Sequence, residues 1–225
     1  MSNEYDFIIE QNADFNRTIT YKDSAGDAID ITDFSKPDLK RTNISIDKVG
    51  YVGSFYKCRG IDLILGLAKL NPNKQFIMIG DIENLNKKKF NIKNITLENF
   101  KPYYQIPKIL ESIDILLMPY EKVVEVNSKN LNTASYCSPL KMFDYLAAAK
   151  IIFSSKLPGI CEILIDNYNA ILLDDTSLKK WNFVLTNLDK YQNLNQIKRN
   201  AYLTACAHTW EKRVMEIISN ANVNT

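Results

Sequence analysis

The sequence predicts an α/β protein built on a Rossmann-like, doubly wound parallel sheet, with an N-terminal extension. From about residue 48 onward, short apolar runs alternate with longer runs of helical periodicity, which is the pattern of parallel strands joined by crossover helices. Most of the short runs are apolar at every position, as expected for strands that are covered on both faces. With 225 residues, 46% of them apolar, the chain is long enough for one large core but not for two full domains.

The two kinds of run give the expected elements in chain order. We predict strands at 48–53, 75–80, 94–98, 113–118, 150–154 and 169–173. We predict helices at 60–70, 103–112, 139–149, 160–166 and 178–191, followed by a long helical stretch at about 194–219. In such a sheet, ligands bind beyond the carboxyl ends of the strands, where loops lead into helix N-termini.

The run from Ser138 to Ala147 joins a helix start, a cation and a carboxylate. Ser138 can cap the first turn, and Pro139 suits the first helical position, so the free amides there favour a phosphate. Lys141 opposes the helix dipole and is poorly placed unless an anion docks beside it. Asp144, one turn on, suits the hydroxyls of a ribose. The run predicts a nucleotide site, although it equally fits the start of an ordinary buried helix.

Two segments fall outside the repeating pattern. The loop at 119–137 is polar and longer than most connections, which favours a donor-binding or closing loop over a disordered one. Residues 1–47 contain the turn signal Ser24-Ala25-Gly26-Asp27 and predict a hairpin or a linker. We therefore expect an N-terminal extension at 1–47 and a Rossmann-like domain at 48–220.

Composition excludes several classes of protein. The formal net charge of only +2 does not call for a polyanionic partner, so we expect no binding to nucleic acid. No apolar run approaches the roughly 18–20 residues that span a bilayer, so we expect no membrane span. The four cysteines, which stand far apart, argue against a disulfide framework or a metal site and favour a reducing compartment, the cytoplasm. They are Cys58, Cys137, Cys161 and Cys206.

With the order of segments established, residues from about Asp27 to Glu216 resemble the C-terminal domain of GT-B glycosyltransferases of the retaining, family-four (group 1) type. The most specific piece is Ser138-Pro139-Leu140-Lys141-Met142-Phe143-Asp144-Tyr145-Leu146-Ala147, which is similar to the family form Ser-Pro-Leu-Lys-Leu-Phe-Glu-Tyr-Met-Ala. Other matching pieces occur in the expected order at 27–34, 50–55, 57–62, 76–80, 113–119, 158–162, 166–170 and 210–211.

The resemblance implies that the domain binds a nucleoside-diphosphate sugar, which is a donor substrate, with no cofactor and no metal. Asp144 corresponds to the carboxylate that takes the ribose hydroxyls. The diphosphate meets the helix start from Ser138 through Pro139 to Leu140, with Arg59 and Lys141 as cations. Gly53 is expected to let backbone approach the ligand, and Glu162 is a secondary donor-side residue.

Three departures from the family weaken the implied activity. Tyr136 stands where a glutamate often contacts the donor sugar, so we expect Glu121 or Glu125 to replace it. Ser54 stands where an arginine is common, which weakens the grip on phosphate, and Asp144 is one methylene shorter than the usual glutamate.

The N-terminal acceptor domain of the family is missing, so we expect a separate acceptor-binding domain or subunit as partner. Three hypotheses follow: a glycosyltransferase half, a nucleotide-sugar-binding module, or a truncated or fused remnant without activity on its own.

Overall fold

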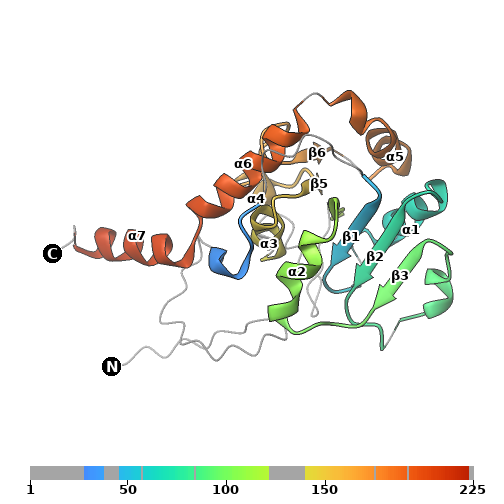
Figure 1. Cartoon of the computed structure of the whole chain (residues 1–225), viewed down its shortest axis with the longest axis horizontal. Coiled ribbons are helices and arrows are strands. Elements are labelled where there is room, and N and C mark those ends of the chain that lie inside the picture. The colour runs from blue at the N-terminus through green and yellow to red at the C-terminus, as the bar shows by residue number, and fades with distance from the viewer. Residues whose placement is uncertain are drawn as a thin grey trace.

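The computed structural model describes residues 28–37, 46–56, 58–83, 85–121, 140–174, 176–191 and 193–222. Its centre is one parallel sheet in the order β3-β2-β1-β4-β5-β6 (Figure 1). This is the order of a Rossmann-type doubly wound sheet, in which the direction of winding reverses between β1 and β4. The predicted fold class is confirmed.

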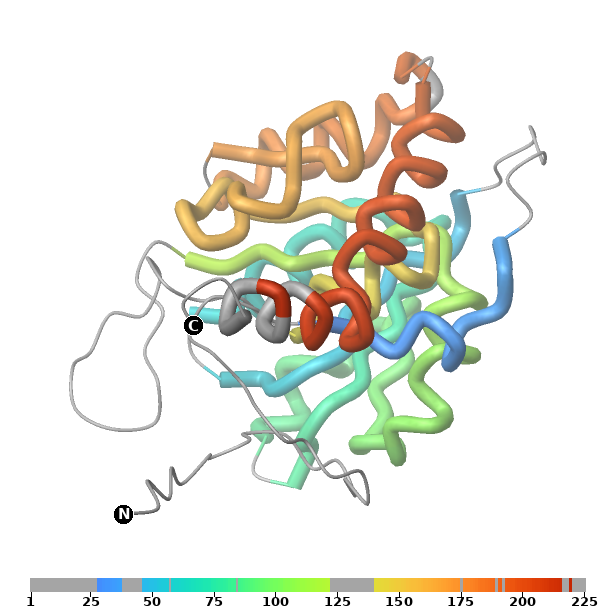
Figure 2. The backbone as a smooth tube through the Cα atoms, turned by 90° about the vertical axis from the view of Figure 1, so that its left-hand side faces the viewer, coloured from blue at the N-terminus to red at the C-terminus, as the bar shows by residue number. Residues whose placement is uncertain are grey.

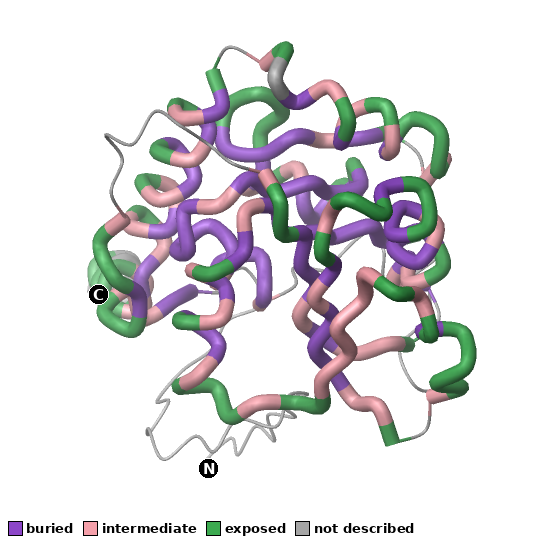
Figure 3. The backbone as a smooth tube through the Cα atoms, turned by 45° about the vertical axis from the view of Figure 1, so that its right-hand side comes forward, coloured by how far each residue is buried: buried purple, intermediate pink, exposed green. Residues whose placement is uncertain are grey.

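All six predicted strands are present in the described part of the chain, and their ends differ from the prediction by at most two residues. β4 and β5 are buried at every position, as their continuous apolar runs require (Figure 3). The strands are β1 Lys48–Val52, β2 Gln75–Ile79, β3 Ile95–Glu98, β4 Ile115–Met118, β5 Ile151–Ser155 and β6 Ile171–Leu173.

Helices cover both faces of the sheet (Figure 1). On one face, α1 (Ile61–Leu70) and α5 (Leu178–Thr186) pack on a cluster in which Trp181 meets the ring of Phe153 at 6.3 Å. On the other face lie α2 (Ile106–Glu111), α3 (Lys141–Ala147) and α6 (Leu194–Ala207). The short 3-10 helices are η1 (Ile31–Asp33), η2 (Lys87–Phe90), η3 (Tyr103–Gln105) and η4 (Leu188–Lys190).

Three helix predictions were wrong in their extent. The helix expected at 178–191 is α5, which ends at Thr186 and is followed by the separate 3-10 helix η4. The helix expected at 160–166 is α4 (Pro158–Cys161), which ends early because the Asn169 side chain donates to the carbonyl of Ile163 and accepts the amide of Ile165. The long C-terminal stretch is two helices, α6 and α7 (Trp210–Asn222). They separate at His208, whose Nδ1 lies 2.8 Å from the carbonyl of Thr204.

Residues 28–37 pack against the domain. Ile29 forms a parallel bridge with Thr209, which places this segment beside the start of α7 (Figure 2). Ile29 and Phe34 are buried within the cluster under α3 and α6. Residues 1–27 lie outside the described residues, so the expected hairpin and the domain limits stay predictions. None of the described helices is both long and apolar enough to cross a membrane.

Candidate functional site

The predicted site lies where the sheet reverses its winding. The ladder between β1 and β4 covers only Val49 and Gly50 of β1, so the carboxyl ends of these two strands are not paired with each other. Beyond the ladder, the amide of Val52 donates to the hydroxyl of Tyr145, which belongs to α3, at 2.9 Å. In doubly wound sheets, ligands bind in the crevice at this switch point.

Lys141, at the start of α3, points its charge into this region. Its side chain is buried, and Nζ lies 4.1 Å from the centre of the Tyr51 ring and 5.4 Å from that of Tyr120. These distances are within the range of cation–π attraction. The faces of the two tyrosines therefore offset part of the cost of burying the ammonium, and the expectation that an anion docks beside Lys141 stays a prediction.

Gly53 is required by the same ammonium. A Cβ on Gly53 would lie 2.5 Å from Nζ of Lys141, and the φ angle of +147° disfavours any other residue. Ser54 follows, and its carbonyl accepts the Tyr51 hydroxyl at 2.6 Å. Burial raises the pKa of the Tyr51 phenol, so this hydroxyl stays a donor. The hydrogen bond from Tyr51 thus holds the turn after β1 in place.

Arg59 reaches the same place from the loop before α1. Its guanidinium carbon lies 4.9 Å from the centre of the Tyr120 ring, so Tyr120 contacts both predicted cations. The loop is held by the amide of Glu121, which donates to the carbonyl of Cys58 at 3.0 Å. Gly60, with a φ angle of +68°, lies so close to Pro119 that a Cβ would overlap its carbonyl oxygen.

Asp144 is partly buried one turn along α3 from Lys141. Its Oδ1 accepts the hydroxyl of Tyr103 at 2.9 Å. The pKa of Asp144 is raised to about 7, chiefly by burial and also by the charge of Asp33, while the Tyr103 hydrogen bond and Lys141 act in the opposite sense. This carboxyl group therefore changes its charge near neutral pH.

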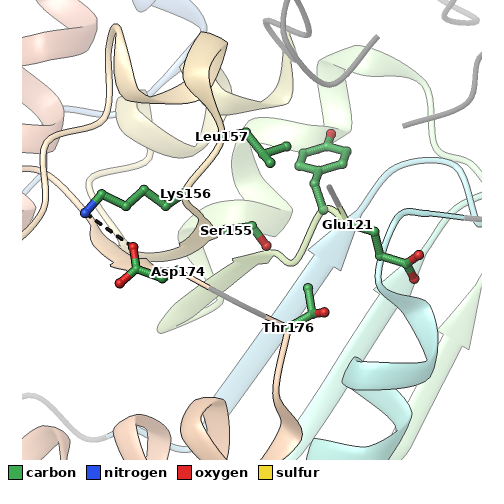
Figure 4. Close-up of a pocket in the computed structure, with 7 residues that line it drawn as sticks. Glu121, Ser155, Lys156, Leu157, Asp174 and Thr176 are labelled. Carbon is green, nitrogen blue, oxygen red and sulfur yellow. Dashed lines mark ion pairs between the residues drawn. The ribbon is translucent and has the colours of Figure 1, made fainter. Parts of the chain in front are cut away.

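A cavity of about 240 Å³ lies at the carboxyl ends of β4, β5 and β6 (Figure 4). Arg59 and Lys141 do not line it, but Tyr120, which both contact, does. Ser155 is 4% exposed, and its Oγ has no hydrogen-bond partner in the described part of the chain. Lys156 and Asp174 form an ion pair at 3.4 Å on one side of the cavity. The residues that line it are Tyr120, Glu121, Ser155, Lys156, Leu157, Asp174 and Thr176.

An unsatisfied buried hydroxyl costs about 1–3 kcal/mol, so the Ser155 hydroxyl favours a ligand that hydrogen-bonds to it. The cavity offers hydroxyl, carboxylate and ammonium groups around a partly apolar wall, which is the chemistry that holds a polyhydroxylated ring.

The structure brings most of the predicted residues together. Gly53, Arg59 and Lys141 converge on Tyr51 and Tyr120, with Ser54 adjoining. Leu140 stands just before α3 in helical conformation. By contrast, Glu162 is exposed at the end of α4 and is not among the residues lining the cavity. Ser138, Pro139, Tyr136 and Glu125 lie outside the described residues.

Sequence reasoning missed the aromatic and hydroxyl members of the site. Tyr51 lies next to the end of β1 and Tyr120 lies just after β4, and these positions are the only signal that the two residues give. Tyr103 stands at the start of a predicted helix, which gives no sign of its contact with Asp144. Ser155 gives no signal, because it directly follows the strand predicted at 150–154.

A comparison with models of protein families shows to which family this chain belongs. The model of the family described as glycosyl transferases group 1 matches residues 40–203, which includes every strand and the two cations. This chain belongs to the glycosyl transferases group 1 family. The resemblance drawn from the sequence is thereby confirmed. Among curated proteins, none matches this group 1 chain.

Solved structures show the same fold in group 1 and related enzymes. The C-terminal domain of the group 1 protein LpcC from Francisella tularensis aligns with a TM-score of 0.57 and 16% identity, over 80% of this chain and 97% of that domain. HepE from Anabaena, in complex with UDP-glucose, aligns with a TM-score of 0.66 and 14% identity, over 88% of this chain and 56% of HepE.

Sucrose-phosphate synthase from Thermosynechococcus elongatus also aligns, with a TM-score of 0.66 and 12% identity, over 88% of this chain and 52% of the synthase. This group 1 chain thus corresponds to a single C-terminal domain and spans about half the length of the larger enzymes.

Proposed function

We propose that this chain is the donor-binding half of a glycosyltransferase and that it holds a nucleoside-diphosphate sugar at the β1/β4 switch point. The observation that carries the proposal is the convergence of Arg59 and Lys141 on the ring of Tyr120, which also lines the cavity, with Asp144 one turn along α3 from Lys141.

The order of these groups matches the order of parts in a nucleotide sugar. Asp144 would accept the ribose hydroxyls, Arg59 and Lys141 with the start of α3 would meet the diphosphate, and the cavity would take the sugar. A charge-assisted hydrogen bond contributes roughly 1.5–3 kcal/mol and a helix terminus about 0.3–1 kcal/mol, which together support modest affinity. The solved complex of HepE with UDP-glucose supports this class of ligand.

In this proposal, transfer occurs with retention of configuration and without a metal ion or other cofactor. The departing diphosphate gains negative charge, and the two cations are placed to stabilise that charge. Glu121, which lines the cavity, would contact the sugar in place of the glutamate that Tyr136 replaces.

The acceptor would be bound by a separate domain or subunit. This part of the proposal is supported by the fraction of the larger neighbours that the chain covers, about half of HepE and of sucrose-phosphate synthase. Transfer is then expected only when both halves are present, whereas donor binding requires this half alone.

A second candidate function is a nucleotide-sugar-binding module without turnover. It is favoured by Ser54 and Tyr136, which replace an arginine and a glutamate of the family pattern. A third candidate is a remnant with a structural role only, and its site would have no measurable affinity for a nucleotide sugar.

Calorimetry separates the three candidates. The whole chain is titrated with UDP-glucose, ADP-glucose and GDP-mannose, and the ligand that binds is then incubated with the chain while sugar release is measured. Binding with sugar release by the chain alone, or with transfer once an acceptor-binding half is supplied, supports the glycosyltransferase half. Binding with neither release nor transfer under both conditions supports the module. The absence of binding at millimolar concentration of all three would reject both.

A further inference from the structure

The hydrogen bond between Tyr103 and Asp144 joins two segments that are 41 residues apart. Tyr103 opens η3, directly after Pro102 and the edge strand β3, whereas Asp144 lies in the middle of α3. The bond thus places the segment between β3 and α2 against the carboxylate to which the proposed function assigns the ribose.

The direction of this hydrogen bond is fixed by the two groups. Burial raises the pKa of the Tyr103 phenol above its ordinary value, and the charge of Asp144 raises it further, so the phenol keeps its proton. Tyr103 therefore donates, and Oδ1 of Asp144 accepts.

The surroundings of Asp144 oppose its negative charge. Asp33 of η1 faces it and raises its pKa, and Asp30, which precedes η1, acts in the same sense on Tyr103. Within α3, Lys141 favours the charged form, and Tyr145 is the other ionisable neighbour. Tyr103 is the group that binds the carboxylate directly.

We infer that Tyr103 is a positioning residue of the ribose site: its hydroxyl holds Oδ1 of Asp144 and leaves Oδ2 to accept the ribose diol. The inference rests on the proposed function. Without the hydroxyl, the carboxylate turns more freely and takes up a proton at a higher pH, and a protonated carboxyl group is a poorer acceptor for two hydroxyls.

The test is the pH dependence of affinity in Tyr103→Phe. The probe is whichever of UDP-glucose, ADP-glucose and GDP-mannose binds the wild type, because a diphosphate esterified at both ends lacks the phosphate ionisation near pH 6 that a terminal phosphate has. Affinity is measured by calorimetry from pH 5.5 to 8.5. Wild-type affinity should rise with pH around a midpoint near 7, where Asp144 loses its proton.

In Tyr103→Phe the midpoint should move to higher pH, and affinity at pH 7 should fall about 3- to 10-fold. Tyr104→Phe is the matched control, because Tyr104 is 77% exposed and its hydroxyl bonds only to Gln105 among the described residues. Tyr104→Phe should leave both affinity and midpoint unchanged.

Tyr103→Phe in an Asp144→Asn background should change nothing further, because the titrating group is gone. An unchanged midpoint in Tyr103→Phe, with the wild type binding normally, overturns this inference and leaves the proposed function standing. A wild type that binds none of the three probes overturns both.

Discussion

At the scale of single residues, the site depends on one small residue. The backbone turn at Gly53 leaves room for the Lys141 ammonium between the chain and the face of Tyr51. Burying a cation costs free energy unless it is compensated, and here aromatic faces supply part of the compensation. The φ angle of +147° and the close approach of the ammonium together favour glycine at position 53.

Gly53→Ala is predicted to weaken both the fold and the site. The new Cβ would lie 2.5 Å from Nζ, and alanine disfavours a φ angle of +147°, so we expect a loss of about 1–3 kcal/mol in the free energy of unfolding. Nucleotide-sugar affinity should fall as well, because Lys141 must move. Urea unfolding and calorimetry measure the two effects.

Gly66→Ala in α1 is the control for Gly53→Ala. Gly66 is helical, and a Cβ placed there would meet only the side chain of Leu178, which can shift. Gly66→Ala should therefore leave the affinity for a nucleotide sugar unchanged. If Gly53→Ala also binds the nucleotide sugar like the wild type, the proposed link between Gly53, Lys141 and the ligand is wrong.

Asp144→Asn is predicted to stabilise the fold while weakening the site. The carboxyl pKa rises from 3.8 to about 7 on folding, so the native state holds the proton more tightly than the unfolded chain. The resulting stability is fully present below pH 4 and is lost as the pH rises through 7. Asparagine cannot ionise, so the variant should exceed the wild type at pH 8 by on the order of 2 kcal/mol, and match it at pH 4.

Nucleotide affinity should move in the opposite direction, with a loss of about 1.5–3 kcal/mol at pH 8. Asp62→Asn removes the same charge from an exposed position on α1 and should change stability by less than about 0.5 kcal/mol. Urea unfolding at the two pH values, with calorimetry at pH 8, decides the matter. If Asp144→Asn and the wild type have equal free energies of unfolding at pH 8, the charged Asp144 carboxylate does not destabilise the fold and the prediction is wrong.

At the scale of elements, side chains that bond to backbone set the boundaries that the apolar pattern does not. Asn169 is the clearest case, since its amide binds the carbonyl of Ile163 and the hydroxyl of Thr204 while its oxygen accepts the amide of Ile165. It ends α4 and ties the corner before β6 to α6.

Asn169→Ala is expected to lower the free energy of unfolding by about 1–3 kcal/mol, because buried backbone groups lose their partners. Affinity for a nucleotide sugar should be unchanged, since Asn169 belongs neither to the cavity nor to the two cations. Asn187→Ala, which removes an exposed side-chain bond to Phe183 at the end of α5, is the milder comparison. A larger loss from Asn187→Ala would contradict this account of the corner.

The strands were predictable because β4 and β5 are covered on both faces and so read as unbroken apolar runs. The end of α4 and the break at His208 were not, because each depends on a hydrogen bond made by one side chain. Among the candidate site residues, Arg59, Lys141 and Asp144 were predicted from the helix-start pattern and the family resemblance. Tyr51, Tyr103 and Tyr120 were missed, because their roles arise only from contacts between distant segments.

At the scale of the whole molecule, the strand order itself creates the site. Winding reverses between β1 and β4, so the loops after these strands diverge, and the groups that follow them face a common region. Cations from the loop before α1 and from the start of α3 meet there on the ring of Tyr120, which also lines the cavity. The proposed donor site is therefore built from segments of this one domain.

The central claim is that Lys141 and its neighbours hold the diphosphate of a sugar donor. It is tested most directly by calorimetric titration of the wild type and of Lys141→Met with UDP and with uridine, since methionine keeps an unbranched chain between the tyrosines but removes the charge. We predict that Lys141→Met weakens UDP binding at least tenfold and leaves uridine binding unchanged. Equal losses for UDP and uridine, or no loss for either, would contradict it.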